Sequence, residues 1–424
     1  MQGKKESFLK DVINQIKSKE AKAFIEKELS LHIKANKISW MKKGLKEHEA
    51  EEKAIKQMGN PLQLGKDLNK LHRPKIDWLM MGLLLAAFGF GFLPLSVIDG
   101  EYDSYPLIVN KIIQVIFGVG ITVGVMLLDY RKLEKYRMNF YKIGCVFLLF
   151  IILFSNTQVN GYSYIHIPGL FEINAYYALP FFFVGWAGIL NQKKLTVWYF
   201  LKLWIFSFLL FYMSNQSIII NGLYLMMILV MLWWSKLDKK KVIWILSTMA
   251  AIIVSIVVIL LSTVKEYQLT RLYAFLHPNE TNGGYMYLKI KEVLENAEWI
   301  GASKLFVLPQ SHTDFAFVSI VNAYGYIAGV LLLVVLLVFL LRLIKILHLV
   351  QIQNSYGKLL VIGGMVLYVA PVVYNIGMVV GLLPIIGMYL PFISYGMLSI
   401  FLHAIGIGIA LSIYRRKDLQ NKTI

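Results

Sequence analysis

Long apolar stretches alternate with short polar ones from residue 76 to the end of the chain. A helix needs about 20 apolar residues to cross the hydrocarbon core of a bilayer. Ten stretches come near that length: residues 76–98, 107–128, 139–155, 173–190, 196–213, 216–235, 242–262, 315–341, 358–383 and 391–414. The pattern predicts an all-α polytopic membrane protein with about ten transmembrane helices in a domain spanning residues 76–424.

Basic residues occur in every second connection between these stretches. Lys and Arg are concentrated at 129–137, 191–195, 236–241, 342–358 and in the tail after 414. Neither residue occurs at 99–106, 156–172, 214–216 or 382–390. Because positively charged loops resist translocation, the alternation predicts that both termini are cytoplasmic.

One predicted outer loop is long, from about residue 263 to 314, between the seventh and eighth helices. Apolar residues recur in it at helical spacing: Ile290, Val293, Leu294, Ala297 and Ile300. Charged residues occupy the other face: Lys291, Glu292, Glu295 and Glu298. The spacing favours an amphipathic helix at the membrane surface; the alternative is a solvated loop.

Residues 1–75 form a second predicted domain, a small cytoplasmic module of helices. Two apolar stripes at helical spacing, one from Phe8 to Ile16 and one from Phe24 to Ile33, alternate with Lys and Glu. Gly59-Asn60-Pro61 then separates two further helices. The module resembles the cytoplasmic prefix of various Firmicutes membrane proteins, which implies regulation or docking.

Composition excludes several classes of protein. With 57% hydrophobic and 16% charged residues, the chain is too apolar for a soluble domain. The net charge of +18 follows the inside loops and the N-terminal module, so it indicates membrane topology and not nucleic-acid binding. The single cysteine, Cys145, permits no intramolecular disulfide, and the eight histidines show no metal-binding spacing.

Asp314 is the outer carboxylate most suited to chemistry. It adjoins the eighth apolar stretch with no charged neighbour and is flanked by His312 and Thr313, which have hydrogen-bonding side chains. Ionisable groups in a membrane setting are functional candidates, and a buried carboxylate serves as a general base. The alternative is a structural one, in which Thr313 or Asp314 caps the following helix.

Other polar groups on the outer side are suited to binding a substrate. Arg271 and Lys304 are cations of the long loop; the guanidinium suits a pyrophosphate, and the alternative is ordinary solvated charge. Gly and Pro interrupt the helical pattern over residues 374–396, which contain Asn375 and Ser394. Irregular backbone at that depth needs protein or a cavity around it, which predicts a groove for a lipid headgroup.

Three motifs resemble the shape, elongation, division and sporulation family, whose members include FtsW, RodA and SpoVE. They are "RLYAFLHP" (271–278), "LPQSHTDFAF" (308–317) and "NIGMVVGLLPIIGMYLPFISYG" (375–396). The resemblance implies a ten-helix enzyme of the bacterial plasma membrane that polymerises lipid II, an undecaprenyl-pyrophosphate-linked glycan, beside a class B penicillin-binding protein. Asp314 would be its essential base. Arg271 or a divalent cation, Mg²⁺ or Mn²⁺, would neutralise the leaving pyrophosphate.

The predicted substrate-binding residues are Arg271, Lys304, His312, Thr313, Asn375 and Ser394. The chain also departs from the family pattern. Gln310 follows Pro309 where the family has a glutamate, and Asn322 and Ala323 stand where it has two more. These departures leave two alternatives to a glycosyltransferase: a non-catalytic scaffold or regulator of cell-wall assembly, and a flippase for lipid-linked precursors.

Overall fold

The computed structural model describes residues 3–97, 104–159, 162–166, 172–214, 217–261, 273–306, 308–351 and 354–419. It divides the chain into two compact units. The first comprises Met1–Ile76 together with Tyr414–Ile424, and the second comprises Asp77–Ile413. The first unit therefore combines both ends of the chain, whereas the sequence predicted a module of residues 1–75 alone.

The first unit is built from four helices: α1 (Gly3–Asn14), α2 (Lys19–Lys42), α3 (Glu47–Lys56) and α4 (Pro61–Leu71). Both predicted apolar stripes are buried, with Val12 and Ile25 in the centre of the core. The predicted break between α3 and α4 is also present. Gly59 has a φ of 80°, and the Asn60 side chain accepts hydrogen bonds from the first backbone N–H groups of α4.

The C-terminal tail, residues 414–419, contributes to this core. The Arg416 guanidinium is buried and donates two hydrogen bonds of 2.8 Å to the Glu20 carboxylate on α2. A ring nitrogen of His72 lies 2.6 Å from the Asp418 carbonyl oxygen, and Leu419 packs in the hydrophobic core. The tail thus completes the helical unit.

Arg416→Ala should destabilise this unit. The change removes both hydrogen bonds to Glu20, which we expect to lower the unit's free energy of unfolding by about 1–3 kcal/mol. Hydrogen exchange of the full-length protein should then be faster in α2. Arg415→Ala, a change of the neighbouring charge, should leave exchange as in the native chain; equal effects of the two changes would show that only net charge matters.

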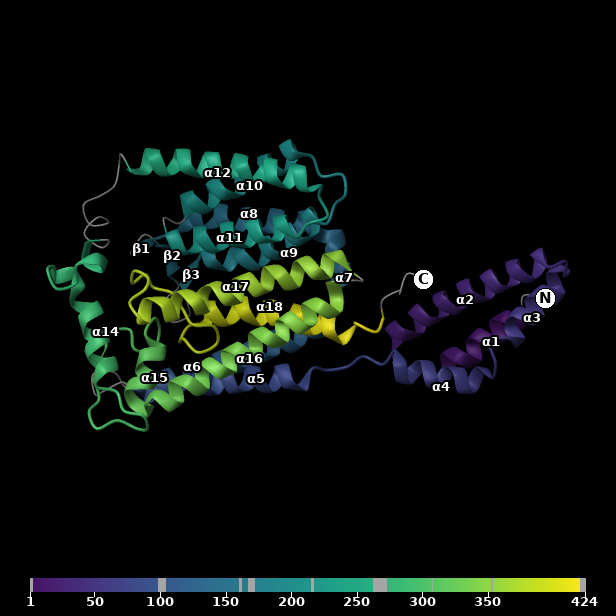
Figure 1. Ribbon diagram of the computed structural model, residues 1–424, viewed down its shortest axis with the longest axis horizontal. Helices are drawn as coiled ribbons and strands as arrows, with labels where there is room; N and C mark the ends of the chain where they lie inside the picture. The colour runs from purple at the N-terminus through teal and green to yellow at the C-terminus, as the bar shows by residue number, and fades with distance from the viewer. Residues whose placement is uncertain are drawn as a thin grey trace. The chain divides into compact units, whose positions relative to one another are not determined.

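The second unit is a bundle of mostly apolar helices (Figure 1). In chain order they are α5 (Trp78–Phe90), α6 (Ser104–Leu127), α7 (Tyr130–Leu133), α8 (Arg137–Phe154), α9 (Leu179–Leu190), α10 (Val197–Ser214), α11 (Ile218–Trp233), α12 (Lys239–Leu261), α14 (Tyr285–Glu295), α15 (Ala316–Tyr324), α16 (Tyr326–Gln351), α17 (Ser355–Val379) and α18 (Met397–Arg415). Short 3₁₀ turns are η1 (Leu93–Val97), η2 (Glu134–Tyr136), η3 (Ala175–Ala178) and η4 (Asn282–Gly284). The all-α class is confirmed, and every predicted apolar stretch contains a helix.

Seven helices of the described part are long and apolar enough to cross a membrane, and two shorter apolar helices accompany them. The chain is therefore a multi-pass membrane protein. Inside the bundle α17 packs against α9, α11 and α16, and α16 also packs against α5. Much of the remaining helix surface is exposed Leu, Ile, Val and Phe, as expected of helices that face lipid.

The eighth predicted stretch is not one continuous helix. It is interrupted at Gly325, where φ is 84°, and α16 then continues to Gln351, beyond the predicted end at 341. A side chain at Gly325 would meet the Trp299 carbonyl oxygen at 2.6 Å. The break separates the short helix α15, which follows Asp314, from the membrane-crossing helix α16.

Several elements gather at one end of the bundle (Figure 1). A three-stranded antiparallel sheet, β1 (Thr157–Val159), β2 (Tyr162–His166) and β3 (Glu172–Asn174), lies there and was not predicted. Helix α14 runs across the same end and buries Ile290 and Val293, as the amphipathic pattern predicts. It ends before Ile300, which is 74% exposed.

Candidate functional site

Asp314 lies in a tight turn just before α15. The backbone N–H groups of Thr313 and Phe315 both donate to the Gln310 carbonyl oxygen, at 3.0 and 3.3 Å. Gln310 itself has a positive φ of 55°, unusual for a residue with a side chain. The N-cap of α15 is Phe315, with no side-chain cap hydrogen bond. The alternative that Thr313 or Asp314 serves as the helix cap is therefore wrong.

The Asp314 carboxyl group is buried and only partly satisfied. The residue is 8% exposed, and its Oδ1 atom has no hydrogen-bond partner among the described residues. Burial raises the pKa of this carboxyl to about 6, because removal from water disfavours the charged form. A carboxylate with a free oxygen and a raised pKa has the properties of a general base.

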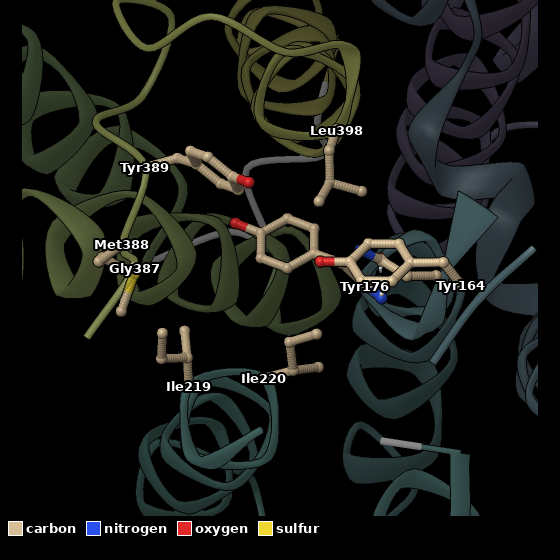
Figure 2. Close-up of a pocket in the computed structure, with 9 residues that line it drawn as sticks. Tyr164, Tyr176, Ile219, Ile220, Gly387, Met388, Tyr389 and Leu398 are labelled. Atoms are coloured by element: carbon tan, nitrogen blue, oxygen red, sulfur yellow. Dashed lines mark hydrogen bonds between the residues drawn. The ribbon is translucent and has the colours of Figure 1, made fainter. Parts of the chain in front are cut away.

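Gly387 has no side chain, and this leaves room for the Asp314 carboxylate. A β-carbon at Gly387 would lie 2.8 Å from Asp314 Oδ2, so the backbone of the 380–396 segment approaches the carboxylate directly. Gly387 also lines a small cavity of about 20 Å³ (Figure 2). That volume holds roughly one water molecule, so a sugar ring would require movement of the lining side chains.

Tyrosines from separate parts of the chain surround that cavity. Tyr164 comes from β2, Tyr176 from η3 and Tyr389 from the segment after α17, and the hydroxyl groups of Tyr176 and Tyr389 point toward one another in Figure 2. The full lining is Tyr164, Asn174, Tyr176, Ile219, Ile220, Gly387, Met388, Tyr389 and Leu398. Aromatic faces with a few polar groups are typical of small-molecule sites.

Two predicted binding residues hold the backbone around Asp314. Asn375 is buried on α17, and its Nδ2 donates to the carbonyl oxygens of Asp314 (2.9 Å) and Met388 (2.6 Å). The Ser394 hydroxyl donates to the Thr313 carbonyl oxygen at 2.6 Å and accepts from the backbone N–H of Leu390. These bonds tie the 308–315 turn to α17 and to the segment before α18.

The neighbours of Asp314 in sequence have separate environments. His312 is half-buried and packs edge-on against Tyr395 at 5.4 Å between ring centroids. Burial, and then the positive charge of Lys111, lower the pKa of His312. The Thr313 hydroxyl donates to the Gln310 carbonyl oxygen at 3.2 Å.

Of the two predicted cations, the structure describes only Lys304, which is not part of this cluster. Lys304 is exposed, and its ammonium lies 4.9 Å from the centre of the Phe306 ring. Arg271 lies outside the described residues. Sequence reasoning thus placed His312, Thr313, Asn375 and Ser394 near Asp314 as found, whereas the position of a cation for the pyrophosphate stays a prediction.

Asn322 has a structural role. This buried residue donates from Nδ2 to the Phe306 carbonyl oxygen at 2.8 Å, and its Oδ1 accepts from the Phe306 N–H at 3.4 Å. The side-chain amide therefore pairs with both the N–H and the C=O of Phe306, as the backbones of neighbouring strands pair in a sheet. At this position, where the resemblance implies an acidic residue, the chain has an asparagine that links α15 to the outer loop by hydrogen bonds.

Sequence reasoning missed Gly387, Lys111 and Gln114. Lys111 is fully buried on α6, and Gln114 is one turn further along the same helix. A lysine inside the apolar stretch at 107–128 is itself a signal, because ionisable residues within membrane spans are rare and functional by default. Gly387 carried no comparable signal, since only the fold shows what lies beside it.

Comparisons with known proteins agree with this architecture. The family of cell cycle proteins FtsW, RodA and SpoVE matches over residues 77–419. A protein of Trichlorobacter lovleyi named probable peptidoglycan glycosyltransferase FtsW is 32% identical over 155 residues, 35% of this chain and 40% of that protein. Peptidoglycan glycosyltransferase MrdB of Escherichia coli K12 is 29% identical over 168 residues, 38% of this chain and 45% of MrdB. The matches thus span less than half of these curated relatives.

Solved structures share the fold. A chain from a peptidoglycan synthase complex, described as coordinating polymerization and crosslinking, superposes with a TM-score of 0.67 at 19% identity over 81% of this chain and 98% of its own. The rod shape determining protein RodA of Thermus thermophilus gives a TM-score of 0.58 at 18% identity over 80% and 97%. Because the family match covers the whole membrane unit, the chain belongs to the FtsW/RodA/SpoVE family of cell cycle proteins.

Proposed function

We propose that this protein is a peptidoglycan glycosyltransferase that polymerises lipid II at the outer face of the bacterial plasma membrane. Its membership in the FtsW/RodA/SpoVE family and relatives named peptidoglycan glycosyltransferases support the reaction class. The observation that carries the proposal is Asp314, a buried carboxyl group with one unpaired oxygen beside a tyrosine-lined cavity.

In the proposed reaction the Asp314 carboxylate accepts the proton of the acceptor sugar's hydroxyl group. The acceptor oxygen forms a bond to the anomeric carbon of the lipid-linked donor as the bond from that carbon to the pyrophosphate oxygen breaks. Attack from the opposite face inverts the anomeric carbon, and undecaprenyl pyrophosphate leaves with the electron pair. We assign Arg271 to the leaving group, since a guanidinium forms paired hydrogen bonds to phosphate oxygens.

An apolar groove supports a lipid-linked substrate. It has a volume of about 520 Å³ and is lined by Val372, Val373, Ile376, Gly377, Val380, Leu382 and Leu383. Most of these residues lie on α17, the helix whose Asn375 binds the Asp314 carbonyl oxygen. A chain of isoprenoid units in this groove would therefore place its pyrophosphate near the level of Asp314.

The proposed setting includes a partner and an orientation. A class B penicillin-binding protein would crosslink the glycan strands, and a fold neighbour from a complex coordinating polymerization and crosslinking supports that pairing. The basic connections at 129–137 and 236–241 support cytoplasmic termini. Asp314, at the opposite ends of the spans from these connections, would then face the outer leaflet, where lipid II is used.

The proposal is tested by the pH dependence of polymerisation with purified protein and labelled lipid II. Because the pKa of Asp314 is raised to about 6, the base is ionised above pH 6 and protonated below it. The rate should be level above pH 7 and fall about tenfold per unit below pH 6. A polymerisation rate that did not fall below pH 6 would contradict the role of Asp314. Size-exclusion profiles at each pH would exclude unfolding as the cause of a lower rate.

A non-catalytic scaffold is the second candidate, favoured by the structural pairing of Asn322 with Phe306 where the resemblance implies an acid. The same assay separates the two. No polymer from this protein, under conditions in which Escherichia coli MrdB makes it, would support the scaffold.

We also propose that a divalent cation, Mg²⁺ or Mn²⁺, arrives with the pyrophosphate. The described residues contain no cluster of three or more His, Cys, Asp or Glu side chains that would hold a metal alone, and Mg²⁺ is commonly bound through one or two carboxylates plus substrate phosphates. Chelation with EDTA should lower the polymerisation rate, and titration of MgCl₂ into substrate-free protein should show no saturable binding below about 1 mM. Tight binding without substrate would overturn this assignment.

A further inference from the structure

Lys111 occupies an unusual position in the interior of the bundle. It lies on α6, is fully buried, and forms no ion pair with a carboxylate among the described residues. Its ammonium nitrogen donates to three consecutive carbonyl oxygens, those of Phe392 (3.2 Å), Ile393 (2.9 Å) and Ser394 (3.2 Å). An ammonium group has three donors, so the three carbonyl groups account for all of them.

The loop that accepts these bonds, residues 390–396, is strained and would not hold its shape alone. Phe392 has a positive φ of 67°, which is an outlier for a bulky residue and persists only where its surroundings enforce it. Gln114, one turn beyond Lys111 on α6, accepts from the Gly396 N–H at 3.2 Å. Two side chains of one helix therefore hold both halves of the loop.

The same loop holds the backbone on either side of the proposed base. The Tyr395 N–H donates to the His312 carbonyl oxygen at 2.8 Å, and the Ser394 hydroxyl donates to the Thr313 carbonyl oxygen. A continuous set of hydrogen bonds thus runs from α6 through the 390–396 loop to the two residues before Asp314. Because burying an ammonium group is costly, its retention here needs a function that a packed apolar side chain would not provide.

We propose that Lys111 is a positioning residue for Asp314, acting through the 390–396 loop. Without the ammonium group, three carbonyl groups lose a donor, the loop relaxes, and the 312–314 turn loses the support of that loop. The proposal rests on the proposed function where it concerns rate, and on geometry alone where it concerns the environment of the Asp314 carboxyl group.

Two variants disturb this arrangement from different sides. Lys111→Met removes the donors with little change in volume. Gly91→Ala keeps the charge, but its β-carbon would lie 2.8 Å from the Lys111 ammonium nitrogen and 2.9 Å from the Ile393 carbonyl oxygen. Gly89→Ala is the matched control, because a β-carbon there meets no atom within 4 Å.

The rate experiment uses full-length variants that elute as monodisperse protein. Lys111→Met and Gly91→Ala should each lower kcat for lipid II polymerisation about 10–100-fold, the size expected for a base displaced by about 1 Å. KM should stay within about threefold, because the carboxylate and not the lipid groove is displaced. Gly89→Ala should keep the native rate; a folded Lys111→Met variant with the native kcat would overturn the proposal.

Infrared titration of the carboxyl band needs no activity, so it separates this proposal from the proposed function. Native protein minus Asp314→Asn isolates the Asp314 band, and Gly91→Ala should lower its midpoint by about half a pH unit or more as water reaches a loosened turn. Gly89→Ala should not move it. An unchanged midpoint in Gly91→Ala would overturn the positioning role, whereas a shifted midpoint in a protein that makes no polymer would contradict only the proposed function.

Discussion

Asp314→Asn should reduce polymerisation of lipid II by about 10²–10⁴-fold, the contribution of a positioned general base. The amide has nearly the shape of the carboxyl group but does not accept the acceptor's proton. The turn around it is held by backbone groups, including the Asp314 carbonyl oxygen bound to Asn375, and the substitution leaves these in place. The measurement is the initial rate of glycan-strand formation from fluorescent lipid II, followed on gels.

Glu295→Gln is the control for this experiment. Glu295 is an exposed carboxylate at the end of α14, 3.8 Å from the Lys291 ammonium group. Exposed ion pairs contribute little to stability, so the control should keep the native rate. A folded Asp314→Asn protein that polymerises lipid II at the native rate would show that Asp314 is not the base.

Gly387→Ala should also have a large effect, lowering kcat about 10–100-fold, although it removes no functional group. The new methyl group would lie 2.8 Å from Asp314 Oδ2 and 3.4 Å from its carboxyl carbon. The first distance is well inside normal van der Waals contact, so either the carboxylate or the 380–396 backbone must move. Initial rates and KM for lipid II, measured together, report the displacement.

Gly406→Ala provides the comparison for Gly387→Ala. Gly406 lies on α18, and a β-carbon there meets no atom within 4 Å. The same chemical change should therefore leave kcat unaltered. Equal rates for native protein and Gly387→Ala would mean that the close approach to Asp314 has no part in catalysis.

The helices were predictable because apolar length is a local property of the sequence. All ten predicted stretches contain helices, and Asn60 and Pro61 begin α4 as their chemistry predicts. The break at Gly325 was not predictable, because an isolated glycine in an apolar run is tolerated in helices. Its positive φ becomes necessary only beside the Trp299 carbonyl oxygen, which the sequence does not place there.

The candidate site also has one part that the sequence predicts and another part that it does not. Asp314 was found from its neighbours in sequence, as the outer carboxylate adjoining an apolar stretch without a nearby charge. The groups that shape its environment come from far along the chain: Lys111 on α6 acts on carbonyl groups some 280 residues later, and Gly387 comes from the segment after α17. Such pairings require tertiary structure, so sequence reasoning identified the proposed base but not the groups around it.

Because residues 414–419 complete the N-terminal helical unit, this unit is finished only late in synthesis of the chain. Glu20 leaves the ribosome early, but its partner Arg416 is made only after residues 77–413 have followed. At about 5–20 residues per second that interval is roughly 20–70 s. Throughout it the nascent chain carries an unfinished helical unit, whose completion therefore requires that α18 has already been made.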